Sequence, residues 1–99
     1  MHITKEHIIS SLKKEIPLFK NEMGVKSLAL FGSYAKNSQT EDSDIDFLIE
    51  LTEINYKHLF NVYSFLGKKF PGKKIQLTRK GPHLSEKFLN TIERDLIYV

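Results

Sequence analysis

The sequence contains no cysteine among its 99 residues. This absence excludes a disulfide framework, a thiol nucleophile and any zinc site built on thiolates. The chain also lacks an apolar run approaching the roughly 20 residues that cross a bilayer, and its start lacks the basic-then-apolar layout of a signal peptide. No internal repeat, low-complexity tract or linker interrupts the sequence. We therefore expect a cytoplasmic protein with no membrane segment.

The composition is that of an ordinary folded protein, with 40% hydrophobic and 27% charged residues. A length of 99 residues suits one core, so we expect a single domain over residues 1–99. The net charge is +3. Basic residues cluster in the part of the chain after its middle, at Lys68, Lys69, Lys73, Lys74, Arg79 and Lys80. Such a cluster is either a solvated rim or a phosphate-attracting surface, and charge alone does not decide between them.

The first quarter of the chain has apolar residues at helical spacing. They form one stripe, made of Ile8, Ile9, Leu12, Ile16, Phe19 and Met23. Thr4 can cap the start of the helix, and Gly24 predicts its end. Pro17 lies inside the stripe, which predicts a kink or a break into two pieces near Ile16.

Two strands are expected next. Residues 25–31 are short, β-prone and mostly apolar, as in a buried strand, and the polar residues 36–42 must form a loop. From Ser43 the chain alternates with period two, which predicts a second strand. Its apolar back comprises Ile45, Phe47, Ile49 and Leu51, and its front comprises Asp44, Asp46, Leu48 and Glu50.

The pattern of the second half of the chain predicts a helix, a strand and another helix. Residues 56–70 return to helical spacing, with Tyr56, Phe60 and Tyr63 expected in the core, and Pro71-Gly72 ends that helix. Residues 74–78 form a third strand. Ser85 caps a last helix that turns Phe88, Leu89 and Ile92 inward, and the apolar tail 96–99 packs on the core. This order predicts an α/β (α+β) fold with helices packed over a small mixed β-sheet.

The acidic residues of the second strand are unusual because Asp is a poor strand former. Asp44 and Asp46, two residues apart, share one face about 6–7 Å apart along the backbone. Their carboxylates can converge on a hard cation such as Mg²⁺. Alternatively, they decorate the exposed side of an edge strand. Glu50 lies roughly 13 Å further along and is expected to be a solvated charge outside the pair.

Gly32 and Ser33 directly follow the first strand. Glycine permits a tight turn, N–H groups after a strand can form an anion-binding nest, and the Ser33 hydroxyl can donate to a phosphate oxygen. A Gly-Ser pair alone is most often an ordinary turn. Together with Asp44 and Asp46 on the next strand, it predicts a phosphate cradle beside a metal-binding carboxylate pair.

These motifs resemble the polymerase-β-type nucleotidyltransferase superfamily, especially its minimal stand-alone members, the MntA-like antitoxins. The family signature is Gly-Ser, a spacer, and then Asp-x-Asp inside an apolar strand. Here it stands as Phe31-Gly32-Ser33-Tyr34-Ala35-Lys36, followed by Ser43-Asp44-Ile45-Asp46-Phe47-Leu48-Ile49. The similarity extends to the leading helix, to "GVKSLALFGSYA" and to the closing "IERDLIYV", so that it covers nearly the whole chain.

The resemblance implies Mg²⁺-dependent transfer of a nucleoside monophosphate from an NTP, expected to be ATP, to an acceptor with release of pyrophosphate. It implies that Gly32 and Ser33 bind the triphosphate, and that Asp44 and Asp46 are the catalytic residues as Mg²⁺ ligands. Minimal members often act beside a HEPN-domain protein as the antitoxin of a toxin–antitoxin pair. Some of them adenylylate a tyrosine of that partner.

One departure from the family pattern concerns a third carboxylate, which relatives normally carry on the following strand. The matching position here is Gln76. An amide oxygen can contact a metal only weakly and cannot act as a base. No acidic residue occurs between Glu53 and Glu86. The missing acid should impair chemistry more than NTP binding.

Three hypotheses therefore stand. The first, which we favour, is an active nucleotidyltransferase in which two carboxylates suffice or the partner supplies a ligand. The second is a nucleotide- and metal-binding pseudoenzyme that acts by docking onto another protein. The third, a small nucleic-acid-binding module, rests on the lysine cluster alone, without a motif or interleaved aromatic residues, and ranks last. The sequence leaves the oligomeric state open.

Other conspicuous side chains receive structural interpretations. The four histidines, His2, His7, His58 and His83, show no ligand spacing and are expected to be surface or structural residues. Tyr34 is expected to pack at the turn after Ser33 rather than to contact a base.

Overall fold

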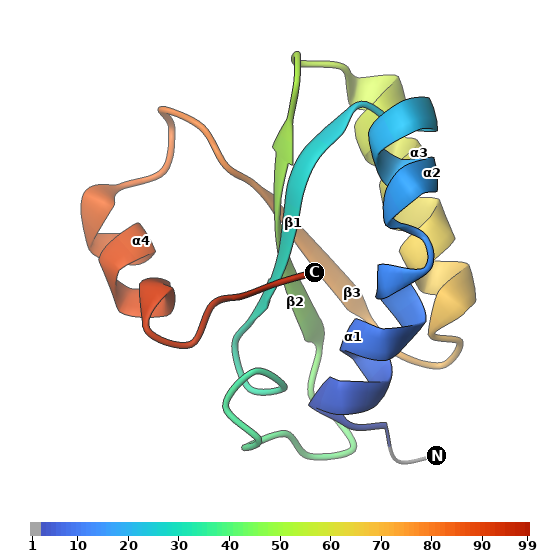
Figure 1. The fold of residues 1–99 in the computed structure, drawn as a ribbon. Coiled ribbons are helices and arrows are strands. Elements are labelled where there is room, and N and C mark those ends of the chain that lie inside the picture. Colours follow the sequence, from blue (N-terminus) through green and yellow to red (C-terminus); the bar gives the residue numbers. More distant parts are fainter. Residues whose placement is uncertain (1–2) are drawn as a thin grey trace.

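The computed structural model describes residues 3–99, so that His2 lies outside the described residues. Figure 1 shows one central sheet with helices on both of its faces. The strands are β1 (Val25–Phe31), β2 (Ile45–Leu51), β3 (Ile75–Arg79) and β4 (Ile97–Tyr98), and the helices are α1 (Lys5–Lys13), α2 (Ile16–Glu22), α3 (Tyr56–Lys69) and α4 (Glu86–Glu93). The strand order is β3-β2-β1-β4. β1 is antiparallel to β2 and β4, whereas β2 and β3 are parallel, so the predicted mixed sheet is confirmed.

The N-terminal helical stripe is divided in two, as Pro17 predicts. α1 ends at Lys13, and α2 begins at Ile16 with the proline in its first turn, where a missing N–H costs no helical hydrogen bond. The Thr4 hydroxyl oxygen accepts from the His7 N–H at 3.1 Å and caps α1. Gly24 follows α2 at a φ of +63° and turns the chain into β1.

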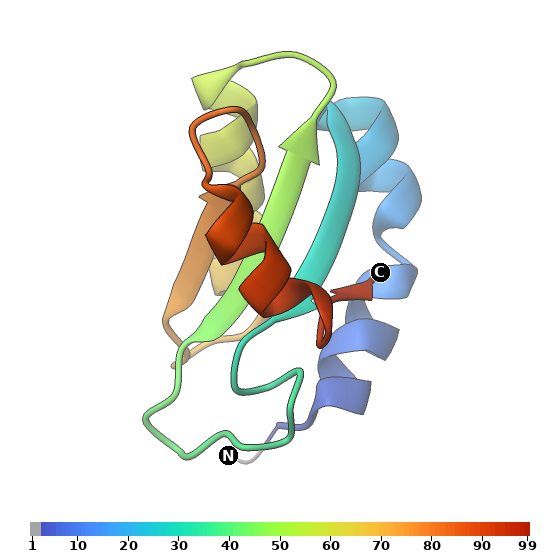
Figure 2. The ribbon, with the colours of Figure 1, turned by 90° about the vertical axis from the view of Figure 1, so that its left-hand side faces the viewer.

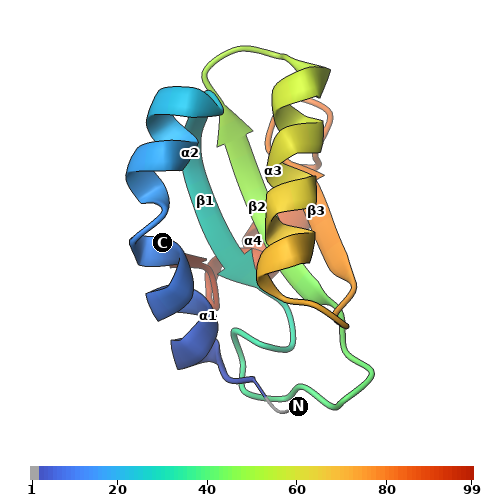
Figure 3. The same cartoon turned by 90° about the vertical axis from the view of Figure 1, so that its right-hand side faces the viewer.

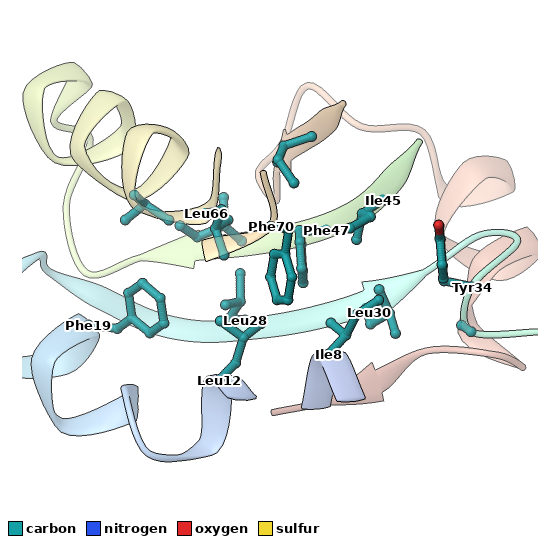
Figure 4. Close-up of a cluster of buried hydrophobic side chains, with 14 of the residues drawn as sticks. Ile8, Leu12, Phe19, Leu28, Leu30, Tyr34, Ile45, Phe47, Leu66 and Phe70 are labelled. Carbon is teal, nitrogen blue, oxygen red and sulfur yellow. The ribbon is translucent and has the colours of Figure 1, made fainter. Parts of the chain in front are cut away.

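The main core lies between the sheet and the layer formed by α1, α2 and α3, which Figure 3 shows in front of the sheet. The predicted back of β2 is buried here, since Ile45, Phe47 and Ile49 are all fully inaccessible. The facing helices supply further buried side chains, namely Ile8, Leu12, Phe19, Val62 and Leu66. Figure 4 shows how Ile8, Leu12, Phe19 and Leu66 meet the strands. The alternating pattern of β2 therefore predicted its buried side correctly.

A second, smaller core lies on the opposite face, under α4 (Figure 2). Phe31, Leu48 and Ile92 are buried there, and the Phe31 and Phe88 rings meet edge to face at 6.0 Å. The Ser85 hydroxyl oxygen accepts from the Phe88 N–H at 3.1 Å, which confirms the predicted cap. The front of β2 is therefore not open along its whole length, because α4 covers Leu48.

The C-terminal tail packs on the sheet as expected. β4 pairs with β1 through Ile97 and Tyr98, and the Val99 N–H donates to the Leu28 carbonyl at 2.9 Å. Within residues 3–99, no helix has both the length and the apolar character needed to span a membrane.

The prediction that Tyr56, Phe60 and Tyr63 are core residues is wrong. Their exposed fractions are 73%, 66% and 46%. α3 carries apolar residues on two sides, and the sheet covers the side of Val62 and Leu66. Since a helix packed on a sheet buries one face, the aromatic side faces outward.

Candidate active site

Asp46 and Gln76 lie on the α4 face of the sheet, near the end where the loop between β1 and β2 joins β2 (Figure 2). Asp46 lies opposite Phe31 in the antiparallel pair and opposite Gln76 in the parallel pair, so these three side chains form one row across the sheet. Asp44 immediately precedes β2, which begins at Ile45 rather than at Ser43 as predicted. Both aspartates are half-buried.

Asp44 and Asp46 are neighbouring acids whose negative charges are not balanced by a positive side chain among residues 3–99. Burial, and secondly the charge of Asp44, raise the pKa of Asp46 above its ordinary value of 3.8. In the described part of the chain, no hydrogen bond or ion pair holds either carboxylate. A cation between them would remove the repulsion and restore the lost solvation. Carboxylate oxygens are ligands that Mg²⁺ accepts, usually together with waters and substrate phosphate oxygens.

Gly32 lies directly against the Asp46 carboxylate. A Cβ atom built on Gly32 would collide with that carboxylate and would lie 3.0 Å from Asp46 Cγ, and the φ of Gly32 is +77°. Only glycine combines this conformation with this close approach. Gly32 and Asp46 are therefore in contact, although they are separate in sequence.

The loop that joins β1 to β2 is held by its own hydrogen bonds. After the glycine, the Ser38 N–H donates to the Ser33 carbonyl at 2.9 Å. Before Asp44, the Thr40 N–H donates to the Ser43 hydroxyl at 2.8 Å. These hydrogen bonds hold both ends of the loop, and Ser33 is half-buried there.

Tyr34 anchors this loop and does not face a ligand site. Its side chain is 1% exposed within the main core (Figure 4). The Lys73 ammonium lies 5.9 Å from the centre of the Tyr34 ring and donates to the Glu41 carbonyl at 3.2 Å. At least one member of the lysine cluster therefore stabilises the loop, a role for which the sequence carried no signal.

The third carboxylate is missing in space as well as in sequence. Gln76 is exposed beside Asp46, and nowhere in residues 3–99 do three His, Cys, Asp or Glu side chains gather as metal ligands. Glu50 lies two rows away opposite Ser27. It is half-buried and paired with Lys26 at 3.8 Å, so it is less solvated than the sequence predicted.

The described histidines have structural surroundings. His7 meets the Phe70 ring edge to face at 6.4 Å, and His83 Nδ1 lies 3.4 Å from an Arg79 guanidinium nitrogen. Neither lies in the row of Asp46.

Comparison with known proteins identifies the family. The family model described as "Polymerase beta, Nucleotidyltransferase" matches residues 13–98. The chain belongs to this nucleotidyltransferase family. It is 41% identical over 97 residues to a Methanocaldococcus jannaschii protein named "Putative protein adenylyltransferase MJ0128", covering 97% of this chain and 98% of that one. It is 30% identical over 94 residues to "Protein adenylyltransferase MntA" of Thermococcus cleftensis, covering 95% and 91%. These names support the prediction of an enzyme.

Solved structures confirm the polymerase-β-type nucleotidyltransferase fold. A crystal structure of a mutant MntA–HpeT toxin–antitoxin matches with a TM-score of 0.63 and 16% identity over 97% of this chain and 72% of that one. A toxin–antitoxin structure with AMP-PNP matches with a TM-score of 0.51 and 22% identity over 78% of this chain and 57% of that one.

Replacing Gly32 by alanine should destabilise this nucleotidyltransferase and displace Asp46. The left-handed backbone alone costs a non-glycine residue about 1–3 kcal/mol, and the methyl group collides with the carboxylate. Chemical denaturation should show the lower stability. Gly72→Ala is the matched control, because Gly72 has a φ of +81° but no atom within 4 Å of its Cβ position. If the nucleotide affinity fell equally in both variants, the close approach of Gly32 to the Asp46 carboxylate would not explain the loss.

Asp46→Asn should raise the metal-free stability of the nucleotidyltransferase at pH 7. Because folding raises the pKa of Asp46, its ionised form disfavours the folded state. This penalty is present above the raised pKa and disappears as the pH falls toward the ordinary value of 3.8. The variant should therefore unfold at a higher temperature than the parent in EDTA at pH 7, and the difference should vanish in acid. A lower unfolding temperature for the variant at pH 7 would contradict the inferred cost of the ionised Asp46 carboxylate in the folded state.

Proposed function

We propose that this nucleotidyltransferase transfers the nucleoside monophosphate of an NTP, with ATP preferred, to a protein toxin in the cytoplasm, and so acts as an antitoxin. The observation that carries the proposal is the contact of Gly32 with the Asp46 carboxylate, with Asp44 close enough to raise the Asp46 pKa. A phosphate-binding turn and a cation-binding pair at one place are what nucleotidyl transfer needs.

Each residue of the candidate site has a separate role in this proposal. The Gly32 backbone and the Ser33 hydroxyl would bind the triphosphate, and Asp44 and Asp46 would hold Mg²⁺. When bound, Mg²⁺ neutralises the negative charge that develops on the transferred phosphoryl group. The acceptor hydroxyl oxygen forms a bond to the α-phosphorus, the bond to the β-phosphate oxygen breaks, and pyrophosphate leaves. The hydroxyl proton passes to water, because the Gln76 amide cannot act as a base.

Two kinds of similarity support a protein acceptor. The sequence relatives are named protein adenylyltransferases, and the structural neighbours are toxin–antitoxin complexes, one of them with AMP-PNP. We propose that the partner is a HEPN-domain toxin and that the acceptor is a tyrosine hydroxyl of that toxin. A phenol is neutral at pH 7, so that it can approach the triphosphate without charge repulsion.

A labelling assay tests the proposal. The chain, Mg²⁺ and the protein encoded by the neighbouring gene, as the candidate toxin, are incubated with each of the four NTPs labelled at the α-phosphate. We expect label on the toxin, strongest with ATP and absent in EDTA or with the acceptor tyrosine replaced by phenylalanine. Binding of ATP and of the toxin without label under any condition would refute the transfer reaction.

Gln76 favours a second candidate function, that of a nucleotide-binding pseudoenzyme that neutralises the toxin by docking. Two carboxylates suffice to bind Mg²⁺ with a triphosphate, whereas the metal that activates the nucleophile lacks a charged ligand at Gln76. If docking alone neutralises the toxin, Asp44→Asn with Asp46→Asn should protect cells as well as the parent does. Under the transfer reaction, this variant should not protect them.

A further inference from the structure

The outward side of α3 is an unusual surface for a small protein. Tyr56, Phe60 and Tyr63 expose between 46% and 73% of their surface along one side of the helix. With Leu59 and with Leu77 of β3, they line an open depression of about 300 Å³. Figure 3 shows α3 on the outside of the molecule, beside β3 at the edge of the sheet. We call Tyr56, Phe60, Tyr63, Gly67 and Leu77 the α3 face. Clustered exposed apolar side chains of this kind mark interaction sites.

Gly67 gives the α3 face a gap in its row of side chains. It lies four residues after Tyr63 and seven after Phe60, and thus on the same side of the helix. A Cβ atom on Gly67 would have no neighbour within 4 Å, so no packing in the described chain requires glycine there. Glycine inside a helix is less stable than alanine. An exposed glycine that the fold does not need is explained if another backbone approaches the helix at this point.

The charge around the α3 face indicates the nature of its partner. Between Glu53 and Glu86 the chain has no acidic residue and seven basic ones, of which Lys69 pairs with Glu15 and Lys73 contacts the loop between β1 and β2. Lys57 and Lys68 of α3 are both exposed. A second copy of this chain would bring two basic surfaces together, whereas an acidic partner would be attracted.

The shape of the depression favours a protein over a nucleic acid. Two of its lining residues, Leu59 and Leu77, are aliphatic. Single-stranded nucleic acids bind to aromatic platforms on which successive bases stack in a basic groove, whereas hydrophobic grooves accept the apolar side of an amphipathic helix. Tyr56, Phe60 and Tyr63 have the spacing of a helix that presents an apolar face to a partner.

We propose that an acidic amphipathic helix of the toxin docks on the α3 face, with its apolar side against Tyr56, Phe60 and Tyr63 and its backbone nearest Gly67. This inference rests on the proposed function in taking the toxin as the partner. The α3 face lies on the opposite side of the sheet from Asp46, because α3 packs over Ile45 and Phe47 whereas Asp46 shares the side of Leu48. Docking there leaves the nucleotide site uncovered.

Dissociation constants for the purified toxin test this docking mode. Gly67→Gln fills the gap without burying anything and replaces a poor helix former, so the variant should fold at least as well as the parent. We expect it to weaken toxin binding about tenfold or more, and Phe60→Ser to do the same. Asn61→Gln is the matched control, since it places the same side chain at an exposed position of α3 off the α3 face, and its affinity should be unchanged.

The outcomes separate this inference from the proposed function. If the parent does not bind the toxin, both are overturned. If the parent binds and both Gly67→Gln and Phe60→Ser bind equally well, only the docking mode is overturned. Two other results would assign the α3 face to another occupant. One is a dimer of the parent chain that Phe60→Ser dissociates, and the other is binding of single-stranded RNA that Phe60→Ser abolishes. Mg²⁺-dependent ATP binding should be the same in all variants, because the nucleotide site lies on the other side of the sheet.

Discussion

The double variant Asp44→Asn with Asp46→Asn is expected to lose Mg²⁺-dependent ATP binding and to transfer nucleotide at least about 1,000-fold more slowly than the parent. Cation stabilisation of a transferring phosphoryl group contributes several kcal/mol, and each 1.36 kcal/mol is a factor of ten in rate. Asparagine keeps the size of aspartate but removes its charge, so the fold should survive. Calorimetry with ATP and Mg²⁺ measures the binding, and label transfer from α-labelled ATP measures the rate.

Glu50→Gln is the matched control for this double variant. Glu50 is an acid on the same strand and the same face as Asp46, but it lies two rows further along and pairs with Lys26. Its neutralisation should leave ATP binding and transfer unchanged. Unchanged ATP affinity in the double variant would show that the aspartates do not hold the cation.

Elements with local signals were predicted correctly from the sequence. Pro17 divides the first helical stripe because its ring and missing N–H act within one turn, and Thr4 and Ser85 cap helices through bonds to residues three positions later. The alternation of apolar and polar residues along β2 predicted which of its sides is buried, because successive side chains on a strand point to opposite faces. In each case the deciding interaction lies within a few residues of the chain.

Features decided by distant contacts were not predictable in this way. α3 offered two apolar sides, and only its packing on the sheet determines that Val62 and Leu66 are buried while Phe60 is exposed. The candidate site shows the same division. Spacing predicted that Gly32 and Asp46 act together, but their contact depends on the pairing of Phe31 with Asp46, a register that no local pattern encodes.

Gln76→Asp should raise the rate of nucleotide transfer by roughly 10- to 100-fold, within the range of a charged group placed to assist proton transfer or to hold a catalytic metal. Gln76 is exposed and lies in register with Asp46, so a carboxylate there can join the other two without burial. The added charge should raise the pKa of Asp46 further and lower the metal-free unfolding temperature at pH 7. Mg²⁺ should reverse this loss, because a cation gains affinity from each added anionic ligand.

Gln76→Asn separates charge from shape in this experiment, because asparagine has the size of aspartate without its charge. We expect Gln76→Asn to transfer no faster than the parent and to bind Mg²⁺ no more tightly. If Gln76→Asp gains Mg²⁺ affinity but no transfer, the row formed by Asp46 and Gln76 binds the metal without the geometry for chemistry, and docking becomes the better account of the antitoxin. If it gains neither, the third ligand position is not at Gln76, and the register of β3 with β2 does not define the site.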